Sequence, residues 1–161
     1  ILAWPESHAD WNRPGIMLFG TSPFASDVEA TRELQPAMTF ASEIIAIREL
    51  EAGSSVGYGR RWTAERPSII ATIAAGYADG YPRLAENGTP VLVGDTVAPL
   101  VGAVSMDMIT VDLTDHPGAS IGDLVVLWGP NILVNDVAAH SDTIGYQLLT
   151  GVTPRVPRLY D

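Results

Sequence analysis

The sequence predicts a mainly β fold, an antiparallel barrel or sandwich-like domain that carries two short helices. From Ala37 onward, segments of strand length rich in valine, isoleucine and threonine follow one another at short intervals. Turn signals built on glycine separate these segments, and a helical pattern occurs only near the C-terminus. Short strands with this spacing and glycine punctuation are typical of closed or sandwiched antiparallel sheets.

The individual elements follow from β-branched runs and from turn residues. Strands are expected at residues 38–50, 68–75, 90–93, 97–101, 109–113, 124–128 and, last, 152–160. Turns are expected at Ala52-Gly53, Glu86-Asn87-Gly88, Gly94-Asp95, Pro117-Gly118 and Gly129-Pro130. The predicted helices cover residues 135–140 and 143–150, with Asn135 and Thr143 as N-caps and Gly151 as a terminator.

Residues 1–36 do not share the β pattern. In residues 1–24, a loop containing Arg, Pro and Gly leads into the apolar run 16–19, which we expect to be a buried strand or its exit. Residues 25–36 are polar and predict a connector with at most one turn of helix. We therefore expect two units, 1–36 and 37–161. Because the chain starts at Ile1 without a leader pattern, we also expect it to begin within a longer protein.

Composition narrows the classes of function. The chain has 161 residues, 47% of them hydrophobic, and a net charge of −10. Scattered arginines in so acidic a chain argue against nucleic acid or a membrane surface as a partner. There is no cysteine, and His8, His116 and His140 lack metal-ligand spacing, so we expect no metal site. A cytoplasmic enzyme fits these features.

Two glycine-containing segments carry the strongest chemical signals. Residues 76–83, Gly-Tyr-Ala-Asp-Gly-Tyr-Pro-Arg, gather side chains that orient anions and move protons. Tyr58 lies between Gly57 and Gly59, where the backbone can approach a ligand closely. A phenol there could serve as a general base if positive charge nearby favours its ionised form. The usual explanation for a tyrosine in such a turn is, however, an exposed loop aromatic.

Other segments admit both a structural and a functional explanation. Residues 105–108, Ser-Met-Asp-Met, could be a strand end whose methionines fill a core. Residues 13–16, Arg-Pro-Gly-Ile, look like an anion site, because glycine and a following free N–H can face a phosphate. Pattern alone makes Tyr146 a buried helix aromatic. Arg155 and Arg158 are expected to be solvated arginines of an edge strand without a catalytic role.

Four separated motifs, taken together, resemble a known family. They are Val-Gly-Tyr-Gly-Arg at 56–60, the run at 76–83, Val-Ser-Met-Asp-Met at 104–108 and Thr-Pro-Arg-Val-Pro-Arg at 153–158. With these motifs the chain is similar to the C-terminal part of pyridoxal-phosphate-dependent alanine racemases of fold type III. The resemblance implies a C-terminal β-domain, preceded by a remnant of the end of an (α/β)8 barrel, in a homodimer that interconverts L- and D-alanine.

The resemblance also assigns roles to residues of the β-domain. It implies that Tyr58 is one of the two catalytic bases and takes the α-proton of L-alanine in the partner subunit's active site. The backbone N–H of Met106 would bind the substrate carboxylate there. Tyr77 and Arg83 would line the narrow path by which the substrate reaches the site.

A second set of residues is implied to serve the subunit's own pyridoxal 5'-phosphate. Arg13 would face the pyridine nitrogen of the cofactor, and the backbone N–H groups of Gly15 and Ile16 would bind its phosphate. The hydroxyl of Tyr146 would reach the same phosphate. An arginine at the ring nitrogen matters because it keeps its proton, which leaves that nitrogen unprotonated.

Alternatives to this interpretation remain at the level of sequence. The chain could be the C-terminal domain of a related pyridoxal-phosphate decarboxylase of basic amino acids, although such enzymes typically use a cysteine there. It could belong to a racemase of broader specificity. It could also be a non-catalytic β-module that only dimerises or binds a partner.

One absence leads to a first prediction. All nine basic residues other than histidine are arginine, so the chain has no lysine to bind pyridoxal phosphate covalently. We expect the isolated chain neither to hold the cofactor covalently nor to racemise alanine. Borohydride treatment with the cofactor, followed by dialysis and mass spectrometry, should show no adduct beyond an adventitious one at the terminal amine. A stable internal adduct with lasting absorbance would contradict the prediction.

Overall fold

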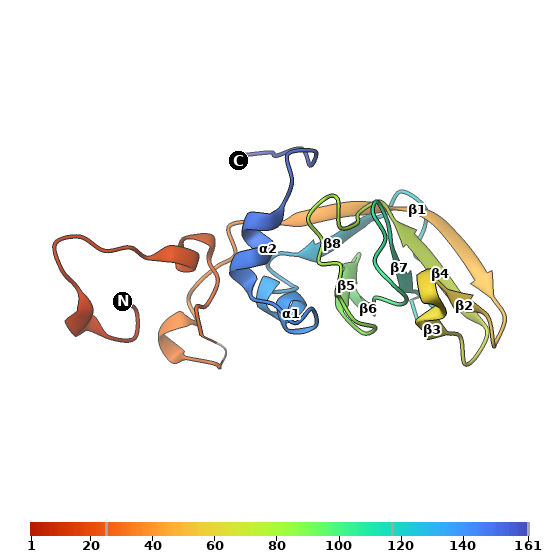
Figure 1. The fold of residues 1–161 in the computed structure, drawn as a ribbon, viewed down its shortest axis with the longest axis horizontal. Coiled ribbons are helices and arrows are strands. Elements are labelled where there is room, and N and C mark those ends of the chain that lie inside the picture. Colours follow the sequence, from red (N-terminus) through yellow and green to blue (C-terminus); the bar gives the residue numbers. More distant parts are fainter. Residues whose placement is uncertain (25, 117, 161) are drawn as a thin grey trace.

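The computed structural model describes residues 1–24, 26–116 and 118–160 and centres on an antiparallel six-stranded sheet (Figure 1). The strand order is β6-β5-β8-β1-β4-β7. The bounds are Phe40–Leu50 for β1, Ser68–Ile73 for β4, Pro90–Val93 for β5, Thr96–Pro99 for β6, Ile109–Asp112 for β7 and Leu124–Trp128 for β8. A bridge between Leu100 and Val111 links the chain after β6 to β7, so the two sheet edges approach and the barrel is nearly closed.

The long strand β1 joins the two halves of the barrel. Its first residues pair with β8, from Phe40 opposite Trp128 to Glu43 opposite Leu124. Its later residues pair with β4, ending with Leu50 opposite Ser68. Register shifts occur in both pairings, and bulges of this kind bend a strand and increase its twist. The predicted β fold is therefore confirmed, and the predicted strands 90–93 and 124–128 have the observed bounds.

A small hairpin not predicted from the sequence lies beside the sheet. It consists of β2 (Ser55–Val56) and β3 (Trp62–Thr63), which pair antiparallel. A 3₁₀ turn, Tyr58–Arg60, connects the two strands. Strands of two residues carry too little periodicity to be recognised in a sequence.

Two short helices follow the last strand, as predicted, but their caps differ from the expectation. They are α1 (Val134–Ala139) and α2 (Gly145–Gly151). Leu133 and Ile144 occupy the N-cap positions, and neither donates or accepts a side-chain cap bond. Asn135 lies inside α1, where its Nδ2 donates to the carbonyl of Ser22 at 3.0 Å. Both expected N-caps were therefore wrong: Asn135 uses its amide in this long-range bond, and Thr143 lies before the cap position Ile144 and bonds through its hydroxyl to the side chain of Gln147. None of the helices in the described residues is long and apolar enough to cross a membrane.

The apolar run near the N-terminus is a 3₁₀ helix, Gly15–Phe19, and the expected strand is wrong. Gly20 closes this helix in the left-handed conformation, with its N–H bonded to Met17 O at 3.0 Å. Ile16 is buried in the main core, whereas Leu18 is 69% exposed. In Figure 1 the N-terminal residues, red to orange, lie on the far side of α1 and α2 from the sheet.

The C-terminal residues also depart from the prediction. Residues 152–160 form a turn and irregular structure instead of a strand. Two prolines in this segment lack the N–H that a sheet ladder needs, and Thr153 bonds to a distant loop. Of the turn expected at Pro117-Gly118, Pro117 lies outside the described residues. The other predicted strands are observed with ends shifted by one or two residues.

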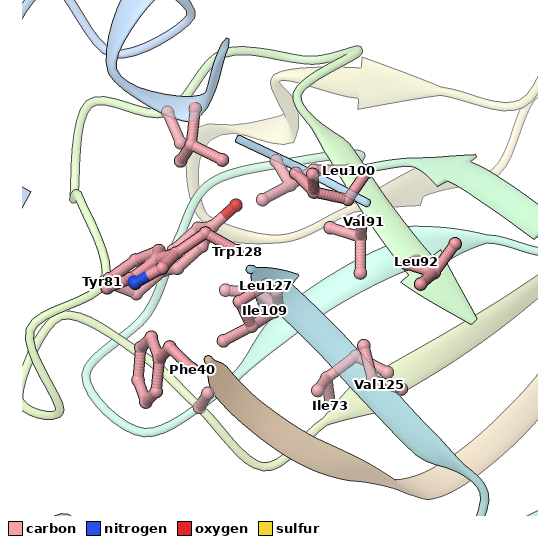
Figure 2. Packing of buried hydrophobic residues seen from close by; sticks show 14 of the residues in the cluster. Phe40, Ile73, Tyr81, Val91, Leu92, Leu100, Ile109, Val125, Leu127 and Trp128 are labelled. Carbon is pink, nitrogen blue, oxygen red and sulfur yellow. The ribbon is translucent and has the colours of Figure 1, made fainter. Parts of the chain in front are cut away.

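An aromatic cluster fills one end of the core (Figure 2). The rings of Phe40 and Trp128 are 4.6 Å apart, and Tyr81 stacks on Trp128 at 6.3 Å. All three side chains are buried. Burial raises the pKa of the Tyr81 hydroxyl above its ordinary value, so the phenol stays protonated. Its oxygen finds no hydrogen-bond partner in the described parts of the chain.

The unpartnered hydroxyl gives a second prediction. A buried polar group without a partner costs free energy, so Tyr81→Phe should leave the free energy of unfolding unchanged or raise it by up to about 1 kcal/mol. Leu127→Ala, at a fully buried site in the same core, should lower it by about 2–5 kcal/mol. Urea denaturation measures both. A loss above about 1 kcal/mol for Tyr81→Phe would mean that the hydroxyl has a partner, such as internal water.

Candidate active site

Tyr58 projects from the β2–β3 turn into solvent, with 79% of its surface exposed. The turn needs glycine on both sides, because Gly57 has φ +75° and Gly59 has φ +71°. Gly57 also packs closely on the neighbouring backbone, since a Cβ placed there would lie 3.0 Å from the nitrogen of Ala103. The two glycines therefore fix where the phenol leaves the domain.

Two loops form the rest of the site, and we call them the tyrosine loop (residues 76–83) and the methionine loop (residues 105–108). The N–H of Tyr77 donates to Ser105 O at 3.0 Å, and the N–H of Ala78 donates to Met106 O at 2.9 Å. These bonds pair the loops backbone to backbone.

Gly76 sits where the two loops approach most closely. A Cβ at this position would overlap the carbonyl oxygens of both Ser105 and Met106. The N–H of Gly76 donates to Asp79 Oδ2 at 2.8 Å, and Asp79 is largely buried. Asp79 thus folds the tyrosine loop onto itself.

A cavity of about 610 Å³ opens between these loops and the β2–β3 hairpin. Its lining consists of Tyr58, Gly59, Arg61, Tyr77, Arg83, Ala103, Val104, Ser105 and Met106. Four of the residues singled out in the sequence, Tyr58, Tyr77, Arg83 and Met106, therefore lie around one space. A second hollow of about 410 Å³ also reaches Tyr58, from the side of β1, β4 and β7.

The cavity has a positive lining in an acidic chain. No aspartate or glutamate lines it, whereas Arg61 and Arg83 both do. Neither arginine forms an ion pair with any residue that the structure describes. Free guanidinium groups in a cleft attract carboxylates. Sequence reasoning did not identify Arg61. Two arginines are adjacent in the sequence, and only the folded turn shows that Arg61 lines the cavity whereas Arg60 does not.

The methionine loop offers a backbone donor at this cavity. Within this loop, the N–H of Ser105 donates to Met108 O at 3.0 Å. The N–H of Met106 makes no hydrogen bond within residues 1–24, 26–116 and 118–160. A free backbone N–H beside two arginines is suited to binding an anion. No group of three or more potential metal ligands occurs in those residues.

The other predicted site residues form a separate group. Gly15 and Ile16 begin the 3₁₀ helix, so their N–H groups have no partner within it. Ile16 packs against the start of α2, where its Cδ1 would lie 3.5 Å from a Cβ at Gly145, next to the half-exposed Tyr146. Arg13 is exposed nearby in sequence. None of these four, Arg13, Gly15, Ile16 and Tyr146, lines the Tyr58 cavity.

The fold is that of a racemase C-terminal domain. Residues 37–160 match the family model for the alanine racemase C-terminal domain. The chain is 60% identical over 159 residues to the alanine racemase of Chromohalobacter salexigens, a match that covers 99% of this chain and 44% of that protein. The chain belongs to the alanine racemase family, which confirms the resemblance drawn from its motifs.

Solved structures agree with this family assignment. The biosynthetic alanine racemase from Pseudomonas aeruginosa superposes with a TM-score of 0.95 at 54% identity, covering 99% of this chain and 45% of that one. The alanine racemase from Bartonella henselae with covalently bound pyridoxal phosphate gives a TM-score of 0.82 at 35% identity, covering 91% of this chain and 40% of that one. The chain spans less than half the length of the curated relatives it matches.

Proposed function

We propose that the chain is the C-terminal part of a cytoplasmic alanine racemase that interconverts L- and D-alanine by a two-base mechanism with pyridoxal phosphate. Residues 1–36 would be the end of its cofactor-binding barrel, and residues 37–161 the β-domain. The observation that carries the proposal is the cavity that joins a phenol, two arginines and a free backbone N–H. These are the groups needed to bind a carboxylate and move a proton.

Tyr58 would act as the base on one face of the substrate's α-carbon. Arg61 and Arg83 line the same cavity and would attract the carboxylate of the substrate towards it. The β2–β3 turn holds Tyr58 between glycines, so its ring can approach a ligand without obstruction from neighbouring side chains.

Met106 and the arginines would orient the substrate. The free N–H of Met106 would donate to one carboxylate oxygen of alanine, and Arg83 would guide that carboxylate from the outer end of the cavity. Tyr77 lies with them in the lining and would narrow the path. A carboxylate fixed in this way turns one face of the α-carbon towards Tyr58.

The second group of residues fits pyridoxal phosphate. The N–H groups of Gly15 and Ile16, which make no hydrogen bond with the described parts of the chain, suit a phosphate, and a Cβ at Gly15 would meet open space, so a ligand has room there. Tyr146 would add a hydroxyl donor, and Arg13 would donate to the ring nitrogen. When bound, this cofactor withdraws electrons from the α-carbon and makes the α-proton acidic. The lysine that would hold it covalently must come from outside this chain.

Two subunits would then form each site. Tyr58 is 79% exposed and Met106 52% exposed, and the exposed Met108 lines the second hollow together with Tyr58. A cluster of exposed apolar side chains around a cavity is typical of a surface that meets another protein. We propose that this surface meets the partner subunit's barrel in a homodimer, so that Tyr58 and Met106 serve the partner's cofactor.

The third prediction tests the base. It uses a hybrid racemase, in which this chain replaces the matching C-terminal part of the Chromohalobacter salexigens relative. Tyr58→Phe should lower racemisation by roughly 10² to 10⁴ without loss of cofactor, because only the proton acceptor is removed. Exchange of the α-proton with deuterium should continue from D-alanine and be lost from L-alanine.

The matched control is Tyr160→Phe, at a tyrosine that is 87% exposed and does not belong to the cavity lining. It should racemise alanine at the rate of the unmodified hybrid. Near-normal activity of Tyr58→Phe would refute Tyr58 as the base, and so would equal loss of exchange from both enantiomers with cofactor still bound.

A further inference from the structure

We propose that Arg155 is a positioning residue for the racemase reaction, because it ties the tyrosine loop to the methionine loop and so sets the geometry of carboxylate binding. The proposal rests on the function proposed above and deepens it. Arg155 lies in the motif at 153–158, which by itself indicated no role for this arginine, and the expected edge strand around it does not form.

The guanidinium of Arg155 bridges the two loops directly. Its Nε lies 2.7 Å from Asp79 Oδ1, and its Nη2 lies 2.7 Å from Asp107 Oδ1. Asp79 belongs to the tyrosine loop and Asp107 to the methionine loop. These hydrogen bonds and charges raise the pKa of Arg155, with the bond to Asp107 as the largest cause. The planar fork of an arginine can serve two carboxylates at once.

The backbone around Arg155 is attached to the tyrosine loop as well. The N–H of Thr153 donates to Asp79 O at 3.1 Å, and its Oγ1 donates to Ala78 O at 2.8 Å. Gly80 packs against the end of α2, where a Cβ would overlap Gly151 O. The segment after α2 therefore lies against the tyrosine loop and presents Arg155 at its junction with the methionine loop.

The three residues of the bridge lie outside the cavity lining, so they would act through the residues that form it. Asp79, Asp107 and Arg155 do not line the cavity, whereas their neighbours Tyr77, Arg83 and Met106 do. Asp79 uses its second oxygen to accept the N–H of Gly76, so one buried carboxylate couples the loop's own fold to the bridge.

Tyr58 is independent of this bridge, since the β2–β3 hairpin holds it. Loss of Arg155 should therefore disturb substrate binding more than proton transfer. The effect on overall stability should be moderate, because the side chains of Arg155 and Asp107 are 47% and 54% exposed, whereas the Asp79 side chain is only 13% exposed and would lose its cationic partner.

The fourth prediction separates these effects in the hybrid racemase. Arg155→Met should raise KM for alanine about tenfold and change kcat by less than about threefold, because the carboxylate site loosens while the base stays in place. Arg155→Lys should restore part of the loss, since an ammonium group can serve one carboxylate well but not both. Adding Asp107→Asn to Arg155→Met should have little further effect, because both changes break the same bridge.

Arg158→Met is the matched control. Arg158 belongs to the same C-terminal segment and is exposed, and among residues 1–24, 26–116 and 118–160 its side chain donates only to Val152 O, at 3.2 Å. The Arg158→Met variant should leave KM and kcat unchanged. The proposal is overturned if Arg155→Met leaves KM unchanged, or if it lowers kcat as strongly as kcat/KM.

A measurement on the chain itself does not depend on racemase activity. Hydrogen exchange should show that Arg155→Met speeds exchange of the Tyr77 and Ala78 amides, which bond across the two loops, by about tenfold relative to amides of β4. Unchanged exchange of these amides would overturn the proposal that Arg155 holds the two loops together. If the unmodified hybrid has no racemase activity, the proposed function fails, and exchange alone decides whether Arg155 holds the loops together.

Discussion

The site depends on one close approach, in which the backbone at Gly76 lies against the carbonyl oxygens of Ser105 and Met106. No side chain fits between these atoms. The approach lets the next two amides of the tyrosine loop bond to the methionine loop, and it brings Tyr77 to the cavity that Met106 also lines. The residues that would bind substrate are thus positioned by backbone contact, which is stiffer than contact between flexible side chains.

The barrel supplies the rigid frame for this contact. Strand β4 leads into the tyrosine loop, and β7 follows the methionine loop directly. The two strands pair in register, with Ile73 opposite Ile109, so both loops leave the sheet at the same end. The N-terminal group around Ile16 packs instead on α2, away from the cavity. This separation supports a dimer in which each chain serves two different sites.

Local sequence signals predicted the sheet, because β-branched runs and glycine turns act over a few residues. They failed for the run at 16–19, since short apolar runs do not distinguish helix from strand, and for 152–160, where Thr153 bonds to a loop 75 positions away. At the candidate site, motifs pointed to Tyr58 and Met106, and the structure places both at one cavity. Arg61 has no such local signal, and the motif around Arg155 indicated no role for it, because the importance of both arises only when separate segments meet.

The most direct test of this account compares two glycine substitutions in urea denaturation. Gly76 does not have a left-handed backbone, so Gly76→Ala strains no torsion, but its methyl group would overlap two carbonyl oxygens. It should lower the free energy of unfolding by about 3 kcal/mol or more. Gly88 has φ +93° and open space around it, so Gly88→Ala should lower the free energy of unfolding by about 1–2 kcal/mol, through backbone strain alone. The account predicts that Gly76→Ala is the more destabilising. A Gly76→Ala chain no less stable than Gly88→Ala would contradict it.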